Sequence, residues 1–242
     1  MIGALRYCLS VFWFTLYHAL RVIVAGYRGI PDEPGGVYDR IPRQWAEDLV
    51  RVNRVGVEAT GLEQLQPGQP YVFASNHLSW VDIWVLLVAI PGRLRFVAKR
   101  GLSYVPFLGP ALRTAHHIFI DRHRLTRAMA AYDEAATVMR TGISAVVFVE
   151  GTRSRDGQLR VFKKGPFVLA IAAGAPVVPV RISGTFEILP RSSVALRPGT
   201  ARITFGAPIP TAGMTYEDRE ALMLQCRQAI EDLAERETAM NR

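Results

Sequence analysis

Residues 71–82, Tyr-Val-Phe-Ala-Ser-Asn-His-Leu-Ser-Trp-Val-Asp, constrain the fold of this chain more than any other segment. The first five residues are β-branched, aromatic or small, which predicts a short buried strand. The apolar run over residues 81–90 that follows predicts a helix. His77 is therefore expected in the turn where a strand gives way to a helix.

His77 and Asp82 can approach each other only through this turn. Five helical steps place them roughly 140° apart around a helix, and an odd separation places them on opposite faces of a strand. If Ser79 is the N-cap, Asp82 takes the third helical position and the two form a capping-box-like pair. Two interpretations stay open: Asp82 only caps the helix, or it orients His77 as a general base for a substrate hydroxyl.

Composition fits a globular or membrane-associated protein with an anionic partner. The 242 residues are 50% hydrophobic and 21% charged, which excludes a disordered chain. A net charge of +8 calls for nucleic acid, anionic lipid or a phosphorylated substrate. Cys8 and Cys226 lie far apart in the sequence, so we expect both to be reduced and predict neither a disulfide nor a zinc site.

Eight of the 29 basic residues lie in one segment with little opposing charge, residues 93–127. It holds one acidic residue, Asp121, and eight basic ones: Arg93, Arg95, Lys99, Arg100, Arg113, Arg122, Arg124 and Arg127. A solvated face is the ordinary explanation for a single arginine. A cluster beside apolar residues instead predicts an anion-binding surface.

The amino-terminal region predicts two helices. Residues 7–20 carry no charged side chain between Arg6 and Arg21, whereas a membrane span needs about 20 apolar residues. We therefore rank an interfacial or half-inserted helix first, a true span second and a signal peptide third. After a turn rich in Pro and Gly, residues 39–52 predict an amphipathic helix. Residues 1–53 thus predict a two-helix element, and the pattern alone leaves open whether it is a membrane-docking element or an ordinary helical hairpin.

From residue 54 onward, short strands alternate with helices. This pattern predicts one α/β domain over residues 54–242, with a largely parallel central sheet flanked by helices. The expected strands are residues 55–59, 71–75, 95–98, 117–120, 144–149, 177–182 and 201–205. The expected helices are residues 80–89, 126–140, 166–173 and 217–237, the last with Thr215 and Asp218 as a start signal.

A second polar segment, Glu150-Gly151-Thr152-Arg153-Ser154, follows the apolar run 145–149. It should lie past the carboxyl end of a strand, the edge where open α/β sheets bind ligands. Gly151 permits a tight turn, Thr152 supplies a hydroxyl, and Arg153 offers a planar fork suited to phosphate. A charged surface turn is the equally good alternative from the pattern alone.

The remaining histidines and the usual catalytic motifs indicate no second chemistry. His116 and His117 should point to opposite faces of a strand, so a shared metal is not expected, and His18 and His123 are interpreted as structural. The sequence has no Gly-x-Ser-x-Gly elbow, so it offers no obvious nucleophile for a covalent acyl-enzyme. It also lacks a Walker A motif, a Rossmann glycine pattern and a His-Glu-x-x-His motif.

Four blocks in a fixed order resemble the glycerolipid acyltransferases, the family of 1-acylglycerol-3-phosphate acyltransferases. The blocks are Asn76–Asp82 with its Asn-His-x4-Asp pattern, Lys99 to Arg122, Glu150–Ser154, and Val177–Val180. Each block alone is a weak signal. Four of them in the family's order make the resemblance specific, and it covers roughly residues 52–210.

This resemblance implies transfer of a fatty acyl group from a thioester to the hydroxyl of a lysophospholipid, first of all 1-acylglycerol 3-phosphate, giving phosphatidic acid. It makes His77 the general base oriented by Asp82. The acceptor's phosphate goes to Lys99, Arg122 and Arg153, with Gly151 and Thr152 in the same turn, and Glu150 supports that turn or braces Arg153. Lys163 and Lys164 could serve the acceptor or a coenzyme A donor.

The same resemblance implies no cofactor beyond the donor, which is acyl-coenzyme A or an acyl carrier protein. It places the protein on the cytoplasmic face of a membrane. Three alternatives stay open: another lysolipid acceptor, a non-catalytic protein that binds anionic membranes, and, motivated only by charge, a nucleic-acid binder.

Overall fold

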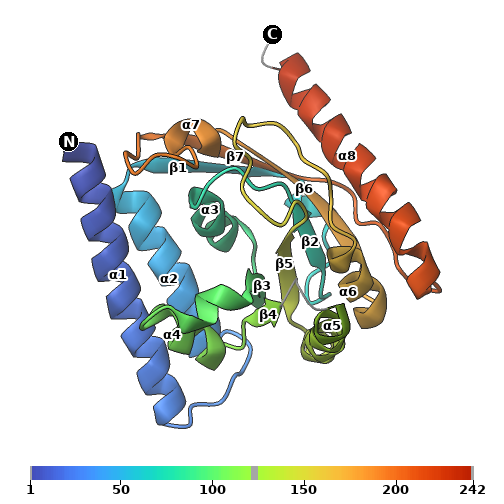
Figure 1. The fold of residues 1–242 in the computed structure, drawn as a ribbon, viewed down its shortest axis with the longest axis horizontal. Coiled ribbons are helices and arrows are strands. Elements are labelled where there is room, and N and C mark those ends of the chain that lie inside the picture. The colour runs from blue at the N-terminus through green and yellow to red at the C-terminus, as the bar shows by residue number, and fades with distance from the viewer. Residues whose placement is uncertain (1, 121–124, 241–242) are drawn as a thin grey trace.

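The structure, a computed structural model, describes residues 2–120 and 125–240, which form a seven-stranded sheet with helices on both faces (Figure 1). The strand order is β1-β7-β6-β2-β5-β3-β4, and every pairing is parallel except that of β6 with β7. The strands are β1 (Val55–Thr60), β2 (Val72–Ser75), β3 (Leu94–Lys99), β4 (Ile118–Ile120), β5 (Ser144–Phe148), β6 (Val177–Ser183) and β7 (Gly199–Phe205). The predicted α/β class and all seven predicted strands are confirmed, each within two residues of the expected limits.

Strand β2 lies in the middle of the sheet between β5 and β6. Val72 pairs with Ala145 on one side and with Val177 on the other. All four residues of β2 are buried, as expected for a parallel strand that is covered on both faces. Because β5, β2 and β6 run in the same direction, the loops that leave their carboxyl ends meet at one edge of the sheet.

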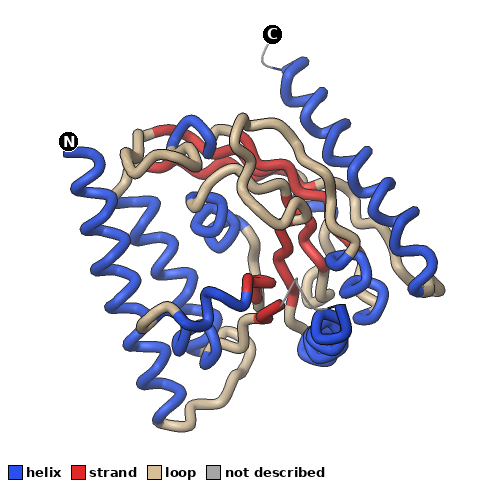
Figure 2. Tube along the Cα trace, in the orientation of Figure 1, coloured by secondary structure: helices blue, strands red, loops and turns tan. Residues whose placement is uncertain are grey.

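The helices are divided between the two faces (Figures 1 and 2). One core packs α2 (Val37–Val52) and α3 (Val81–Ala89) against inward residues such as Phe73 and Phe205. The other packs α5 (Leu125–Met139), α6 (Gly165–Ala173) and α8 (Arg219–Met240) against Val72 and Ala74. Successive residues of β2 therefore face opposite cores, as strand geometry requires.

Two helices were not predicted. α4 (Leu108–Thr114) has Gly109 and Pro110 in its first turn, where proline is tolerated because the first N–H groups of a helix have no partner inside it. α7 (Thr185–Ile188) is a single turn after β6. Three short 3-10 helices complete the described elements: η1 (Leu62–Gln64), η2 (Arg100–Tyr104) and η3 (Tyr216–Asp218). The predicted capping box of Thr215 and Asp218 is present at η3.

The amino-terminal helix α1 (Ile2–Tyr27) is longer than its uncharged segment and packs along α2. His18 Nε2 lies 2.9 Å from Asp48 Oδ2, which confirms His18 as a structural residue. A second bond between the two helices runs from Trp45 Nε1 to Thr15 Oγ1 at 3.0 Å. The opposite side of α1 is an exposed apolar stripe of Leu5, Leu9, Phe12, Trp13, Tyr17, Leu20 and Val24. Residues 4–27 are long and apolar enough to cross a membrane, with a mean hydropathy of 1.6.

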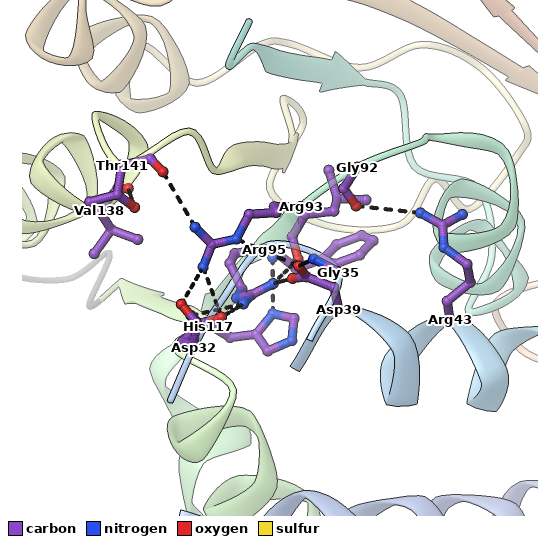
Figure 3. Close-up of polar contacts among 12 residues, drawn as sticks. Asp32, Gly35, Asp39, Arg43, Gly92, Arg93, Arg95, His117, Val138 and Thr141 are labelled. Atoms are coloured by element: carbon purple, nitrogen blue, oxygen red, sulfur yellow. Dashed lines mark hydrogen bonds and ion pairs between the residues drawn. The ribbon is translucent and has the colours of Figure 1, made fainter. Parts of the chain in front are cut away.

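The prediction of an anion-binding surface over residues 93–127 is wrong in part. Aspartates already neutralise two of its arginines, Arg93 and Arg95 (Figure 3). Arg95 is fully buried, and it contacts Asp32 through one nitrogen at 3.0 Å and Asp39 through another at 2.8 Å. Arg93 lies 2.8 Å from Asp32. Asp32 and Asp39 belong to the α1–α2 connection and to α2, so these ion pairs attach the two-helix element to the sheet.

The two adjacent histidines precede β4 instead of lying within it, which corrects the prediction that they point to opposite faces of a strand. His117 Nδ1 accepts a hydrogen bond from Phe96 N at 2.9 Å, and the His116 ring lies edge-on to Tyr38. His116 has a positive φ of 57° and ends α4 with a sharp turn. His123 lies outside the described residues.

Candidate active site

The turn after β2 brings His77 and Asp82 together. His77 Nδ1 lies 2.8 Å from Asp82 Oδ2, and the Asp82 side chain is fully buried. The same oxygen accepts hydrogen bonds from Leu78 N at 2.6 Å and Ser79 N at 2.9 Å, and Thr185 Oγ1 donates to the other oxygen at 2.5 Å. Charge-assisted bonds of this kind fix a carboxylate in position. Asp82 therefore both ends the turn and orients the ring.

The cap of α3 differs in detail from the expected one. The helix begins at Val81, so Trp80 and not Ser79 is the flanking residue. Ser79 Oγ still accepts from Val81 N at 3.2 Å, and it donates to Leu189 O at 2.8 Å. The predicted cap is thus shifted by one residue, while the bond from Ser79 N to Asp82 remains.

Two neighbouring strands hold the turn in place. Asn76 bonds both backbone groups of Ile182 in β6, donating to its carbonyl at 2.9 Å and accepting from its N–H at 2.7 Å. Glu150, past the end of β5, accepts from His77 N at 2.9 Å and from Arg160 N at 3.1 Å. Glu150 was expected either to support the turn or to brace Arg153, and these bonds show that it supports the turn. Burial, its largest influence, raises the pKa of this carboxyl, although the two backbone N–H groups oppose the rise.

The imidazole of His77 is only partly enclosed by its neighbours. Its face stacks on Phe148 at 3.7 Å between ring centroids with an interplanar angle of 13°, and 11% of its side chain is exposed. Among the described residues, none forms a hydrogen bond with Nε2. If Asp82 holds the proton-bearing Nδ1, Nε2 is left as an acceptor at the carboxyl edge of the sheet.

Arg153 lies on the loop that borders the turn of His77. Ser154 N donates to His77 O at 2.7 Å, so the loop after β5 runs alongside the loop after β2 (Figure 1). The Arg153 guanidinium stacks over Trp80 at 4.7 Å from the ring centroid. Gly151 has φ +73°, which is the left-handed backbone that its sequence position predicts. Thr152 is exposed on the same turn.

The other predicted site residues are placed less closely. Lys99 is exposed at the carboxyl end of β3, on the same edge of the sheet. Arg122 lies outside the described residues. Lys164 forms an ion pair with Glu220 of α8 at 2.7 Å, so it is not available to the loop after β5 without breaking that contact. Within residues 2–120 and 125–240, no three His, Cys, Asp or Glu side chains are grouped to hold a metal ion.

Three residues at the site were not predicted: Phe148, Thr185 and Arg191. Phe148 ends β5, so the strand pattern could have placed it at the edge. Thr185 and Arg191 come from segments more than 100 residues after His77, and no local pattern marks them. A hollow of about 500 Å³ between α7, β7 and α8 is lined by Glu187, Arg197 and Glu237 among others, but not by His77. It is therefore separate from the reactive ring.

Known proteins resemble this chain in both sequence and fold. The model of the acyltransferase family matches residues 56–183. Human 1-acyl-sn-glycerol-3-phosphate acyltransferase alpha is 34% identical over 177 residues, which are 73% of this chain and 62% of the relative. A chloroplastic 1-acyl-sn-glycerol-3-phosphate acyltransferase of Brassica napus is 35% identical over 151 residues, 62% of this chain and 44% of that protein. The chain thus spans at most about 62% of the curated relatives named here.

The fold is also that of a solved structure. The crystal structure of the 1-acyl-sn-glycerophosphate acyltransferase PlsC from Thermotoga maritima matches with a TM-score of 0.74, covering 96% of this chain and 95% of that chain at 22% identity. At that identity the likeness concerns the fold alone. The family model covers more than half of the chain, including the whole turn from Asn76 to Asp82 and the Glu150–Ser154 loop. The chain therefore belongs to the acyltransferase family.

Proposed function

We propose that this protein transfers a fatty acyl group from a thioester to the free hydroxyl of 1-acylglycerol 3-phosphate, producing phosphatidic acid. One observation carries the proposal: Asp82 holds His77 Nδ1 at 2.8 Å, and the loop bonded to the backbone of His77 carries Arg153. A base and a cation at one edge match an acceptor that has a hydroxyl to deprotonate and a phosphate to bind. The names of the sequence relatives support the same acceptor.

His77 acts as the general base. Nε2 takes the proton of the acceptor hydroxyl as its oxygen attacks the thioester carbonyl, and donors near the ring stabilise the negative oxygen that forms. The carbon–sulfur bond then breaks, an ester remains, and the proton on His77 passes to the departing thiolate. The buried Asp82 stabilises the imidazolium during this transfer. Because a thioester is already activated, no covalent acyl-enzyme is needed.

Arg153 binds the acceptor's phosphate together with Lys99 and Arg122. Glu150 and Gly151 shape the turn that presents Arg153, and Thr152 adds a hydroxyl on the same turn. The donor is acyl-coenzyme A or an acyl carrier protein. Stacking on Trp80 restrains the guanidinium of Arg153, which lowers the entropy lost when phosphate binds.

The two-helix element, residues 1–53, docks the α/β domain, residues 54–242, on the cytoplasmic face of a membrane. The exposed stripe on α1 is apolar and rich in aromatic residues, which suits the headgroup boundary of a bilayer. On its inner side, Tyr7 contacts Trp84 of α3 at 6.2 Å between ring centroids. Docking through α1 would thus bring the site close to its lipid acceptor.

A test would incubate the purified protein with acyl-coenzyme A or acyl carrier protein and a panel of lysolipids, then identify the products by mass. We expect phosphatidic acid from 1-acylglycerol 3-phosphate as the main product. Acylation of another lysolipid instead would contradict the acceptor. Binding to anionic vesicles with no acylated product from any acceptor would favour the second candidate, a non-catalytic membrane-binding protein.

A further inference from the structure

A second arginine, Arg191, lies beside Arg153 but comes from the loop between α7 and β7. Two hydrogen bonds attach that loop to the site. Ser79 Oγ donates to Leu189 O at 2.8 Å, and Arg191 Nη1 donates to Arg153 O at 2.8 Å. Arg191 is therefore linked to the turn of His77 from one side and to the Glu150–Ser154 loop from the other.

The two arginines share no neutralising partner. Neither forms an ion pair with any carboxylate of the described residues, in contrast to Arg93 and Arg95. Burial lowers the pKa of Arg153, and the positive charge of Arg191 lowers it further, while Tyr7 and Asp82 oppose both. Asp82 is already occupied by His77, two backbone N–H groups and Thr185. Two like charges held together in this way are stabilised when an anion binds between them.

We infer that Arg191 joins Arg153 to form a two-guanidinium site for the doubly charged phosphate of the lipid acceptor, and so selects a phosphate monoester over an uncharged or singly charged head group. This inference rests on the proposed function. Arg191 uses Nη1 to hold the Arg153 carbonyl, and its other nitrogens remain available as donors. A phosphate monoester carries close to two negative charges at pH 7, with a second pKa of about 6, so it gains more from a second cation than a diester does.

The experiment compares four proteins: the full-length wild type, Arg191→Gln, Arg191→Lys and Arg202→Gln. Glutamine removes the charge but can still donate to the Arg153 carbonyl, whereas lysine keeps the charge. Arg202 is exposed on β7 and pairs with Glu58, so its variant controls for the loss of a distant positive charge. Calorimetry in detergent micelles would measure the binding of 1-acylglycerol 3-phosphate, monoacylglycerol and coenzyme A.

We expect Arg191→Gln to weaken binding of 1-acylglycerol 3-phosphate about tenfold or more, because a charge-assisted hydrogen bond to the phosphate is lost. Binding of monoacylglycerol and coenzyme A should not change, Arg191→Lys should lose less, and Arg202→Gln should match the wild type. The wild-type affinity should also fall as the pH drops from 7.5 to 5.5 and the phosphate loses a charge. That fall should be smaller in Arg191→Gln.

The inference is overturned if Arg191→Gln binds 1-acylglycerol 3-phosphate as the wild type does. It is equally overturned if the wild type does not prefer this lipid to monoacylglycerol. A loss confined to coenzyme A would assign Arg191 to the donor and contradict an acceptor site, and an equal loss for all three ligands would indicate a structural role. Because these measurements need no turnover, a wild type that binds selectively but makes no phosphatidic acid would contradict only the proposed function.

Discussion

Two pairs of arginines in this protein have the same chemistry and opposite surroundings. Arg93 and Arg95 contact Asp32 and Asp39, and Arg95 is fully buried (Figure 3). Arg191 donates to the Arg153 carbonyl at the carboxyl edge of the sheet, and neither arginine has a carboxylate partner within the described chain. The first pair attaches the two-helix element to the sheet, while the second is the pair that we propose binds an anion.

The contrast shows that the position of a carboxylate, and not the number of arginines, separates a structural cation from a binding one. A buried ion pair whose partner is removed leaves a costly unpaired charge. A cation at an accessible edge that has no carboxylate partner can instead attract and bind an anionic ligand. Substitutions in the two pairs should therefore change different quantities: stability in the first, and ligand affinity in the second.

The largest effect on stability is expected from Arg95→Met. Asp32 and Asp39 would lose the buried guanidinium between them, and breaking a buried pair typically costs about 3–5 kcal/mol. Urea unfolding should show a loss toward the lower end of that range, since Arg93 still contacts both aspartates. Arg202→Met, which removes an exposed pair, should cost less than about 1 kcal/mol. Equal losses in the two variants would show that the Arg95 network does not hold the elements together.

A smaller and different effect is expected from Arg153→Ala. The acceptor KM should rise roughly tenfold or more, because a charged hydrogen bond to phosphate is lost. The free energy of unfolding should change by less than about 1 kcal/mol, since Arg153 is only partly buried and forms no ion pair with the carboxylates that the structure describes. Steady-state kinetics with varied acceptor would test this. An unchanged KM would remove Arg153 from the phosphate site.

The smallest expected effect is that of Asp32→Asn on the free energy of unfolding, and it should depend on pH. Burial would raise the pKa of Asp32, but Arg95 and Arg93 outweigh it and hold that pKa below its ordinary value. A lowered pKa contributes stability above the unfolded-state pKa, which is about 3.9. Asp32→Asn should thus be less stable than the wild type by about 1–2 kcal/mol at pH 7. The difference should shrink as the pH falls below about 4 through the lowered pKa, and a difference independent of pH would contradict the ion pair.

Local sequence patterns could predict most of the fold. Short runs rich in β-branched and apolar residues located all seven strands. The signal is strongest for central strands such as β2, because a parallel strand covered on both faces is apolar along its length. The spacing of His77 and Asp82 left one geometry for their approach, and the structure has that geometry. The short helix α4 was not predicted, because it contains Gly109 and Pro110, and glycine and proline usually interrupt helices.

Long-range partners could not be predicted in this way. Thr185 and Arg191 reach the site only because β6 lies beside β2, a pairing of distant segments. The prediction for residues 93–127 failed in part for the same reason. Asp32 and Asp39, which neutralise Arg93 and Arg95, lie more than 50 residues earlier in the sequence. Charge composition predicts an anionic partner for the whole chain, but only tertiary structure shows which cations remain unpaired.

The most direct test of the central claim is the turnover of His77→Ala with 1-acylglycerol 3-phosphate and acyl-coenzyme A. General-base catalysis contributes about 10²- to 10⁴-fold, so we predict a loss of that size in kcat, with lipid binding and circular dichroism unchanged. A folded His77→Ala protein that retained most of the wild-type rate would contradict the proposal that this imidazole, oriented by Asp82, removes the proton of the acceptor.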